Sequence, residues 1–326
     1  MTHFRTISLL FLLSLTIHAQ PAQAHPWGGL VIDSVGRIFF SFVCPIVGDS
    51  HVACIWQLDP GETSPKTTLS AQSSPSDLIL ARSYQRHLYS AERDMYRNEV
   101  QAKLWRLTDT GAHQTVIKRT RNPFHFSPEA FTVDHNGTLF FAHETKIYQH
   151  TSSGEISIIA GNVQGYKDGI GVNAQFDRIT SIAWGPDSTL YIVDRDRLRR
   201  MRPSGDIDTI AAKVKETSPQ NLPFSGANII FDMAIDSLGN AYLAYYGNRR
   251  VLKVSASGEV TTLLEAEEDW SPHGVDCFAG DVYVLESTVG VPSWWQFWKS
   301  TEIRPRIRKI NQAGEVETIY EHPSAE

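Results

Sequence analysis

The chain has 326 residues, of which 36 are Asp or Glu and 30 are Lys or Arg, so its formal net charge is −6 at pH 7. This acidic balance excludes a general nucleic-acid-binding surface, which needs clustered positive charge. A chain of this length can bury a large core as one domain, as closed all-β folds often do. We therefore expect a monomer that does not bind nucleic acid.

The first 24 residues have the pattern of an export signal. Arg5 precedes an apolar run over residues 7–17, and Ala22, Gln23 and Ala24 form a typical signal-peptidase site. The alternative, an uncleaved membrane anchor, requires about 20 apolar residues, and this run is shorter. The sequence predicts a signal peptide over residues 1–24 and a mature chain over residues 25–326. We expect a secreted or periplasmic protein that is not transmembrane after cleavage.

An internal repeat of about 50 residues organises the rest of the chain. A first turn anchor recurs six times, at Gly36, Arg86, Gly137, Ser188, Gly239 and Gly280. A second anchor recurs in step with it, at Gly61, Gly111, Gly154, Gly205, Gly258 and Gly314. Two landmarks in register, six times each, indicate a repeated structural unit.

Each unit is rich in short strands and lacks helical periodicity. A strand follows each first anchor, over residues 38–42, 88–90, 139–142, 190–193, 241–244 and 282–285. One small antiparallel sheet cannot bury both of its faces, whereas radial packing of several sheets buries each face against a neighbour. The sequence predicts an all-β, six-bladed β-propeller with four antiparallel strands per blade. A linear solenoid is the alternative. Residues 306–320 complete the last unit without an N-terminal strand.

Two segments resemble the NHL repeat. In residues 160–194, four glycines form the expected loop between blades: Gly161, Gly165, Gly169 and Gly171. Ala174 and Phe176 are expected to pack under this loop. Residues 235–263 are a second match. The resemblance implies an NHL-type propeller, distantly similar to the SMP-30/gluconolactonase-like superfamily. NHL propellers include lyases, scaffolds, receptor domains and RNA binders, so the resemblance implies a fold more strongly than an activity.

Related propeller enzymes suggest where a site would lie. The gluconolactonase group holds one divalent metal at the channel mouth, and the peptidyl-hydroxyglycine lyases use histidines there. The corresponding positions here are Gly28, Ser76, Glu129, Thr180, Phe231 and His273. The resemblance implies a site for Ca²⁺ or Zn²⁺ formed by Glu129, His273 and one or two of Asp232, Asp194 and Glu286. The alternative is that these groups only bind backbone and water. No Pro-Asn-Gly or Pro-Asp-Gly motif stands at the expected turn.

Insertions and cysteines complete the candidate features. A long insertion over residues 287–305 carries an aromatic cluster: Trp294, Trp295, Phe297 and Trp298. This cluster is interpreted as a lid on its own blade, a ligand or partner contact, or a membrane-interface contact. Residues 44–53 and 93–102 are smaller insertions. An exported chain permits a disulfide between Cys44 and Cys54, which leaves Cys277 as a buried thiol.

These patterns support two functional hypotheses. The first is a propeller that binds a small molecule, glycan or protein at one face of the ring. The second is a metal-dependent hydrolase or lyase, similar to the gluconolactonase group, with the metal at the channel mouth. The sequence assigns no catalytic residue and leaves open whether the protein is an enzyme.

Overall fold

The computed structural model describes residues 29–43, 53–70, 76–83, 86–94, 103–107, 113–117, 130–214, 229–288 and 303–323. These ranges form 25 β-strands and three short 3-10 helices, Gly171–Asn173, Pro186–Ser188 and Tyr246–Asn248. The prediction of an all-β propeller is confirmed. No helix among the described residues is long and apolar enough to span a membrane.

The strands form six antiparallel sheets, each made from strands that are consecutive in the chain. The first three sheets are β1–β4 (Leu30–Ile32, Ile38–Val43, Ala53–Leu58, Lys66–Ser70), β5–β8 (Ser76–Arg82, Leu88–Asp94, Lys103–Leu107, His113–Ile117) and β9–β12 (Ala130–Val133, Leu139–His143, Lys146–His150, Ile156–Ala160). The fourth sheet contains β14–β17 (Ile179–Trp184, Leu190–Asp194, Arg197–Met201, Asp206–Ala211), with β13 (Gly169–Ile170) added outside β17. The last two are β18–β21 (Ile230–Ile235, Ala241–Tyr245, Arg250–Val254, Val260–Glu265) and β22–β25 (Trp270–Phe278, Asp281–Thr288, Pro305–Ile310, Val316–Glu321).

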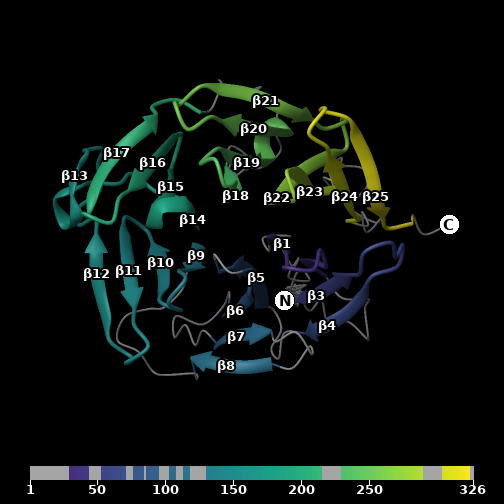
Figure 1. The fold of residues 1–326 in the computed structure, drawn as a ribbon, viewed down its shortest axis with the longest axis horizontal. Coiled ribbons are helices and arrows are strands. Elements are labelled where there is room, and N and C mark those ends of the chain that lie inside the picture. Colours follow the sequence, from purple (N-terminus) through teal and green to yellow (C-terminus); the bar gives the residue numbers. More distant parts are fainter. Residues whose placement is uncertain are drawn as a thin grey trace, which may run out of the picture.

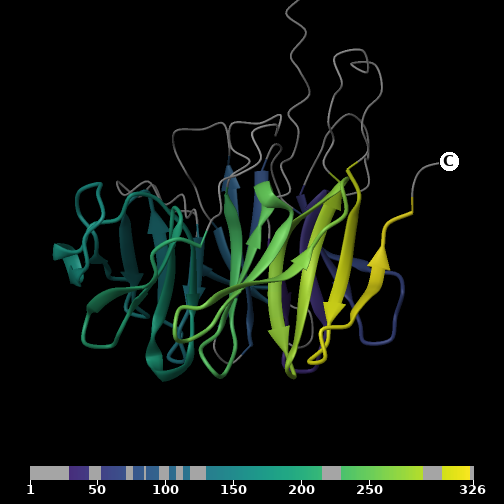
Figure 2. The same cartoon turned by 90° about the horizontal axis from the view of Figure 1, so that it is seen from above.

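The sheets are arranged as a closed ring (Figure 1). The first strands of the sheets lie around the centre: β1, β5, β9, β14, β18 and β22. Each contacts the first strand of the next sheet, and β22 contacts β1. The sixth sheet is completed by its own strands, as predicted for residues 306–320. Figure 2 shows the strands running between the two ends of the ring. We call the end with the connections between first and second strands the turn end, and the opposite end the mouth end.

Apolar side chains fill the space between neighbouring sheets. Six buried clusters lie one at each junction, including the junction that closes the ring. In that last cluster, Leu30 and Phe40 of the first sheet pack with Leu285, Ile307 and Tyr320 of the sixth. Because every face is buried against a neighbour, the ring needs no additional layer to cover its sheets.

The predicted turn anchors share one backbone conformation. All six first anchors have positive φ, including the non-glycine residues Arg86 (φ 62°) and Ser188 (φ 55°). At the turn before β19, the carboxylate of Asp236 accepts hydrogen bonds from the backbone N–H groups of Leu238 (2.9 Å) and Asn240 (2.8 Å). Such a bond stabilises a tight turn, and Asp33 and Asp134 make the same contacts in their own units. The anchors were predicted from the sequence, but the role of the Asp three positions before Gly36, Gly137 and Gly239 was not.

Candidate functional site

The first strands of all six sheets bring side chains together near the centre of the ring. Residues of all six first strands line a cavity of about 50 Å³. That space matches one or two water molecules, since each occupies about 30 Å³ in the liquid. This cavity is too small for a ligand larger than a few water molecules.

Asp194, a predicted metal ligand, holds the end of the loop at Asp177 and Arg178. Its side chain is fully buried and accepts hydrogen bonds from the N–H groups of Asp177 (2.8 Å) and Arg178 (3.0 Å). It also pairs with Arg199 at 3.0 Å. Burial raises the pKa of Asp194, and these donors oppose that effect. The carboxylate already has its partners within the protein.

Arg199, on β16, anchors the NHL-like loop, which is defined as residues 161–178. Its guanidinium has no exposed surface and donates to the carbonyl oxygens of Gln175 (2.6 Å) and Lys167 (2.7 Å). It also pairs with Asp168 at 2.9 Å and stacks over the ring of Phe176 at 4.5 Å. Ala174 and Phe176 are buried in the core below, as the resemblance implied. The loop signature is therefore a folding motif in this chain.

Asp232, a second predicted ligand, joins three first strands. From β18 it accepts the N–H of Val275 in β22 (3.0 Å), that of Met233 (2.9 Å) and that of Leu30 in β1 (3.5 Å). First strands are sheet edges, so some of their N–H groups lack a partner within the sheet. Burial raises the pKa of Asp232 to about 7. Asp276 acts in the same way, accepting the N–H of Ile32 at 2.8 Å.

Glu286, a third predicted ligand, lies toward the mouth end of β23. It is fully buried, and its Oε2 atom contacts Arg306 Nε (2.7 Å) and Arg308 Nε (3.2 Å) of β24. Both arginines also reach Glu267, which is largely exposed. The Oε1 atom of Glu286 is buried and has no hydrogen-bond partner. Burial raises the pKa of Glu286, while Arg306 opposes that shift.

His273 lies at an irregular point of the sixth sheet. The β22–β23 register shifts between Pro272 and Gly274, so His273 lies on a bulge, and Pro272 pairs with Glu286. The imidazole is 1 % exposed, packs 6.5 Å from the ring of Phe42, and has no hydrogen-bond partner at either nitrogen. Burial lowers the pKa of His273 to about 3, so the ring is neutral at pH 7.

We use the name mouth cluster for the buried polar residues toward the mouth end of the sixth sheet: His273, Glu286, Ser287, Arg306 and Arg308. The buried hydroxyl of Ser287 also lacks a partner. The two arginines were not predicted as site residues from the sequence. Their signal was the alternation of Arg304, Arg306 and Arg308, which places three cations on one face of a strand.

Within the described ranges, no group of three or more His, Cys, Asp or Glu side chains is placed to hold a metal ion. Glu129 lies outside those ranges, as do Gly28 and the aromatic cluster: Trp294, Trp295, Phe297 and Trp298. Of the other aligned positions, Ser76 begins β5, Thr180 lies in β14 with an unpartnered buried hydroxyl, and Phe231 packs edge-on against Tyr246 at 5.1 Å. Of the predicted metal ligands that are described, only His273 and Glu286 keep unpartnered buried atoms.

The cysteines divide as follows. Cys54 is disulfide-bonded, and Cys277 is a buried free thiol, as predicted. Burial raises the pKa of Cys277 to about 11, which makes the thiol inert near neutral pH. Cys44 lies outside the described residues, so its pairing with Cys54 stays a prediction.

Comparisons with known proteins support the fold. No family model matches the chain, and no curated protein does. A streptogramin B lyase structure is similar, with a TM-score of 0.53 and 14% identity over 92% of this chain and 83% of that chain. Virginiamycin B lyase from Staphylococcus aureus gives a TM-score of 0.51 and 15% identity over 92% and 85%. Its catalytically inactive histidine-to-alanine variant with quinupristin gives 0.50 and 14% over 89% and 83%. These likenesses define the class of the protein, a β-propeller.

Proposed function

We propose that this protein is a secreted or periplasmic propeller, with each of its six sheets acting as one blade, that binds a ligand at the mouth end. One observation carries the proposal: His273 is buried with both ring nitrogens unpartnered. A buried polar group without a partner costs about 1–3 kcal/mol. A buried group of this kind is expected where a ligand completes its hydrogen bonds.

The chemistry of the mouth cluster suggests the kind of ligand. A neutral imidazole and a hydroxyl can each donate and accept, and the free oxygen of Glu286 accepts. A ligand with several hydroxyl or amide groups would satisfy donors and acceptors of this kind, which fits a glycan or a peptide. The segment with Trp294, Trp295, Phe297 and Trp298 lies in the chain between β23 and β24, whose residues build the cluster. Aromatic rings there would supply a stacking surface for such a ligand.

The test compares His273→Leu with wild type in the mature protein. Thermal unfolding is measured alone and with a panel of neutral oligosaccharides and peptides. We expect the variant to be more stable than wild type, by about 1–3 kcal/mol, because it removes two unsatisfied polar atoms. It should also lose the stabilisation that a ligand confers. His150→Leu, in the third sheet, is the control and should keep the ligand response.

A different result would show that His273 is structural. If His273→Leu unfolds at a lower temperature and still responds to the ligands as wild type does, the unpartnered imidazole does not mark a binding site.

The second candidate function is a metal-dependent hydrolase or lyase. The similarity to streptogramin B lyases favours it, together with the unpartnered, buried imidazole of His273. Glu129 and His273 would be the metal ligands, and Ca²⁺ or Zn²⁺ would polarise a carbonyl or activate water. The other carboxylates fit poorly, since Asp194 and Asp232 are engaged by the protein.

Metal analysis of the mature protein separates the two functions. One equivalent of calcium or zinc, lost in the Glu129→Ala, His273→Ala double variant, would favour the enzyme. Turnover of quinupristin or a simple lactone would then be measured. A protein without metal, or one whose metal survives the double variant, leaves ligand binding as the function.

A further inference from the structure

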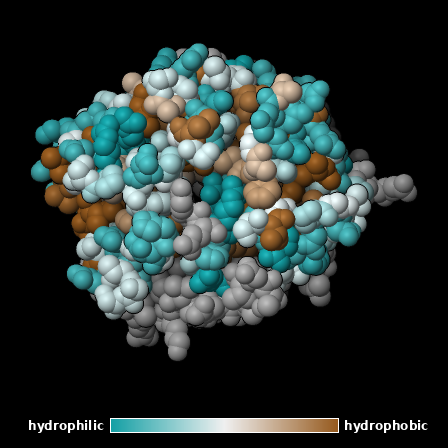
Figure 3. Space-filling model, in the orientation of Figure 1, coloured by the Kyte–Doolittle hydropathy of each residue, from teal (hydrophilic) through white to brown (hydrophobic). Residues whose placement is uncertain are grey.

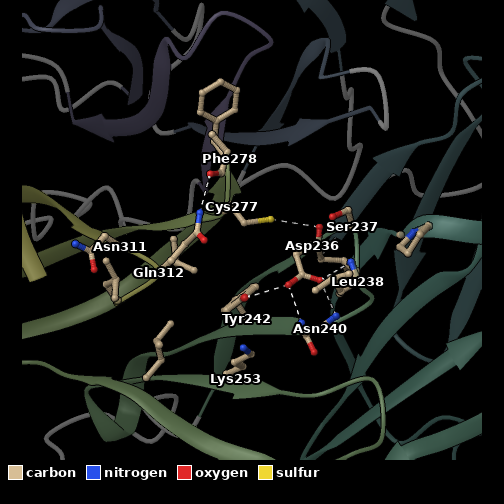
Figure 4. A pocket seen from close by; sticks show the side chains of 18 of the residues that line it. Asp236, Ser237, Leu238, Asn240, Tyr242, Lys253, Cys277, Phe278, Asn311 and Gln312 are labelled. Atoms are coloured by element: carbon tan, nitrogen blue, oxygen red, sulfur yellow. Dashed lines mark hydrogen bonds between the residues drawn. The ribbon is translucent and has the colours of Figure 1, made fainter. Parts of the chain in front are cut away.

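A second, larger cavity opens at the turn end, away from the mouth cluster. It has a volume of about 650 Å³ and lies between the fifth and sixth sheets (Figure 4). Its lining comes from the turns that follow β14, β18, β22 and β24, with Arg82 and Arg86 added from the second sheet. On the face shown in Figure 3, hydrophilic residues line the hollow at the centre of the ring. Small-molecule sites commonly enclose roughly 300–1,000 Å³, so the cavity is large enough for a small molecule.

The walls of this turn-end cavity are partly apolar. Trp184, Ile235, Leu238, Phe278 and Ile310 line it. Leu238 is 77% exposed, although it is a large aliphatic residue. An apolar ligand body would remove such side chains from water, which is favourable in proportion to the area covered.

Cationic side chains outnumber carboxylates around the cavity. Arg82 Nε pairs with Asp276 Oδ1 at 2.8 Å, and Arg86 lies farther away, 3.7 Å from Asp276 Oδ2. The single carboxylate of Asp276 therefore pairs with the guanidinium groups of both Arg82 and Arg86. Burial is the main cause of a lowered pKa for Arg86, and nearby Arg82 adds to it. Arg86 also stacks over Phe278 at 5.0 Å, so its charge stays at the cavity wall.

Lys253 is the third cation of the cavity. Among the described residues it has no ion-pair partner, and its ammonium lies 5.8 Å from the centre of the Tyr242 ring. The nearest acid on this wall, Asp236, is already occupied by the Tyr242 hydroxyl (3.1 Å) and the Asn240 side-chain amide (2.8 Å). Figure 4 shows Asp236 bonded to these neighbours, with Lys253 on the same side of the cavity. The lysine charge is left available to a ligand.

We propose that the turn-end cavity binds an organic anion: a carboxylate, sulfonate or phosphate attached to an apolar body. The anionic group contacts Lys253, while Arg86, whose guanidinium donates to the carbonyl oxygens of Ile32 and Cys277, adds positive charge at the wall. The apolar body packs on Leu238 and other apolar side chains of the lining. A local excess of positive charge in a chain of net charge −6 favours an anion over a neutral or cationic ligand. The site is separate from the mouth cluster, because the two lie at opposite ends of β22.

The test uses two fluorescent probes that differ in charge. 8-Anilinonaphthalene-1-sulfonate carries a sulfonate on an aromatic body, and N-phenyl-1-naphthylamine has the same body without it. Fluorescence titration of the mature protein should show one site for the sulfonate and at least roughly tenfold weaker binding of the neutral probe, because a charge-assisted contact is lost. Affinity for the sulfonate should fall as salt rises.

Variants locate the binding. Lys253→Gln should weaken sulfonate binding about fivefold or more, while Lys66→Gln, on the first sheet, should change it less than twofold. Ser237→Trp keeps every charge but fills the cavity, and it should weaken both probes. His273→Leu, at the other end, should leave both probes unaffected. Equal binding of the two probes, or sulfonate binding that neither Lys253→Gln nor Ser237→Trp changes, would overturn the proposal.

Discussion

Substitution of Arg199, on β16, should lower the free energy of unfolding by releasing the NHL-like loop. Arg199 is fully buried with Asp194, and it holds the loop through the carbonyl oxygens of Gln175 and Lys167. Arg199→Met keeps most of the side-chain length but leaves the Asp194 carboxylate without its cation. Breaking a buried pair by removing one partner costs about 3–5 kcal/mol. We expect a loss of that size in the free energy of unfolding.

The neighbouring Arg200 is a matched control. It lies in the same strand and pairs with Asp208, but both side chains are partly exposed, at 29% and 36%. Exposed pairs contribute about 0–1 kcal/mol, so Arg200→Met should change stability by less than about 1 kcal/mol. Urea unfolding followed by circular dichroism measures both variants.

Limited proteolysis gives a local readout of the same prediction. Trypsin should cut after Lys167 much faster in Arg199→Met than in wild type or in Arg200→Met, because the loop loses its anchor. The double variant Arg199→Met, Asp194→Asn should recover part of the stability, since it no longer buries an unpaired charge. Equal unfolding free energies for Arg199→Met and Arg200→Met, with equal cleavage, would refute the structural role assigned to Arg199.

Three further predictions concern single positions. Gly161→Ala should cost at least about 2 kcal/mol more than Gly154→Ala in thermal or urea unfolding. Both glycines have positive φ, but only at Gly161 would a Cβ clash, 2.1 Å from the Thr145 oxygen. Ellman's reagent should find one thiol, Cys277, in denaturant and none in the native protein at pH 8; three thiols in denaturant would exclude the disulfide. Because its pKa rises to about 7 on folding, Asp232 stabilises the fold at low pH, and this contribution is lost as pH rises through 7. Between pH 4 and pH 8, the free energy of unfolding of Asp232→Asn should therefore change less than that of wild type, by at least about 1.4 kcal/mol. An unchanged pH profile of stability would contradict this.

The sequence alone determined the repeat, the strand positions and the turns. Each depends on local chemistry: apolar strand residues, positive-φ anchors such as Gly36, and short spacing between them. The strands after the anchors begin where expected, for example at Ile38 and Leu139. The prediction that Ala174 and Phe176 pack under the loop also held, because these contacts are close in sequence to the loop.

The tertiary structure decided which polar residues are free. Asp194 follows an expected strand, but only the folded loop shows that Arg199 neutralises it. Likewise, β24 supplies the arginines that occupy half of the Glu286 carboxylate, and a bulge in β22 leaves His273 without a partner. The repeat pattern does not encode such pairings, because they join residues on different strands.

The turn-end cavity depends even more strongly on ring closure. Arg82 and Asp276 are 194 positions apart in the chain, yet their side chains meet at 2.8 Å. A sequence pattern can place each of them at the end of a strand, but not opposite each other. Closure of the ring brings the second and sixth sheets together around β1, and that contact places Arg82 and Arg86 in the wall of the cavity.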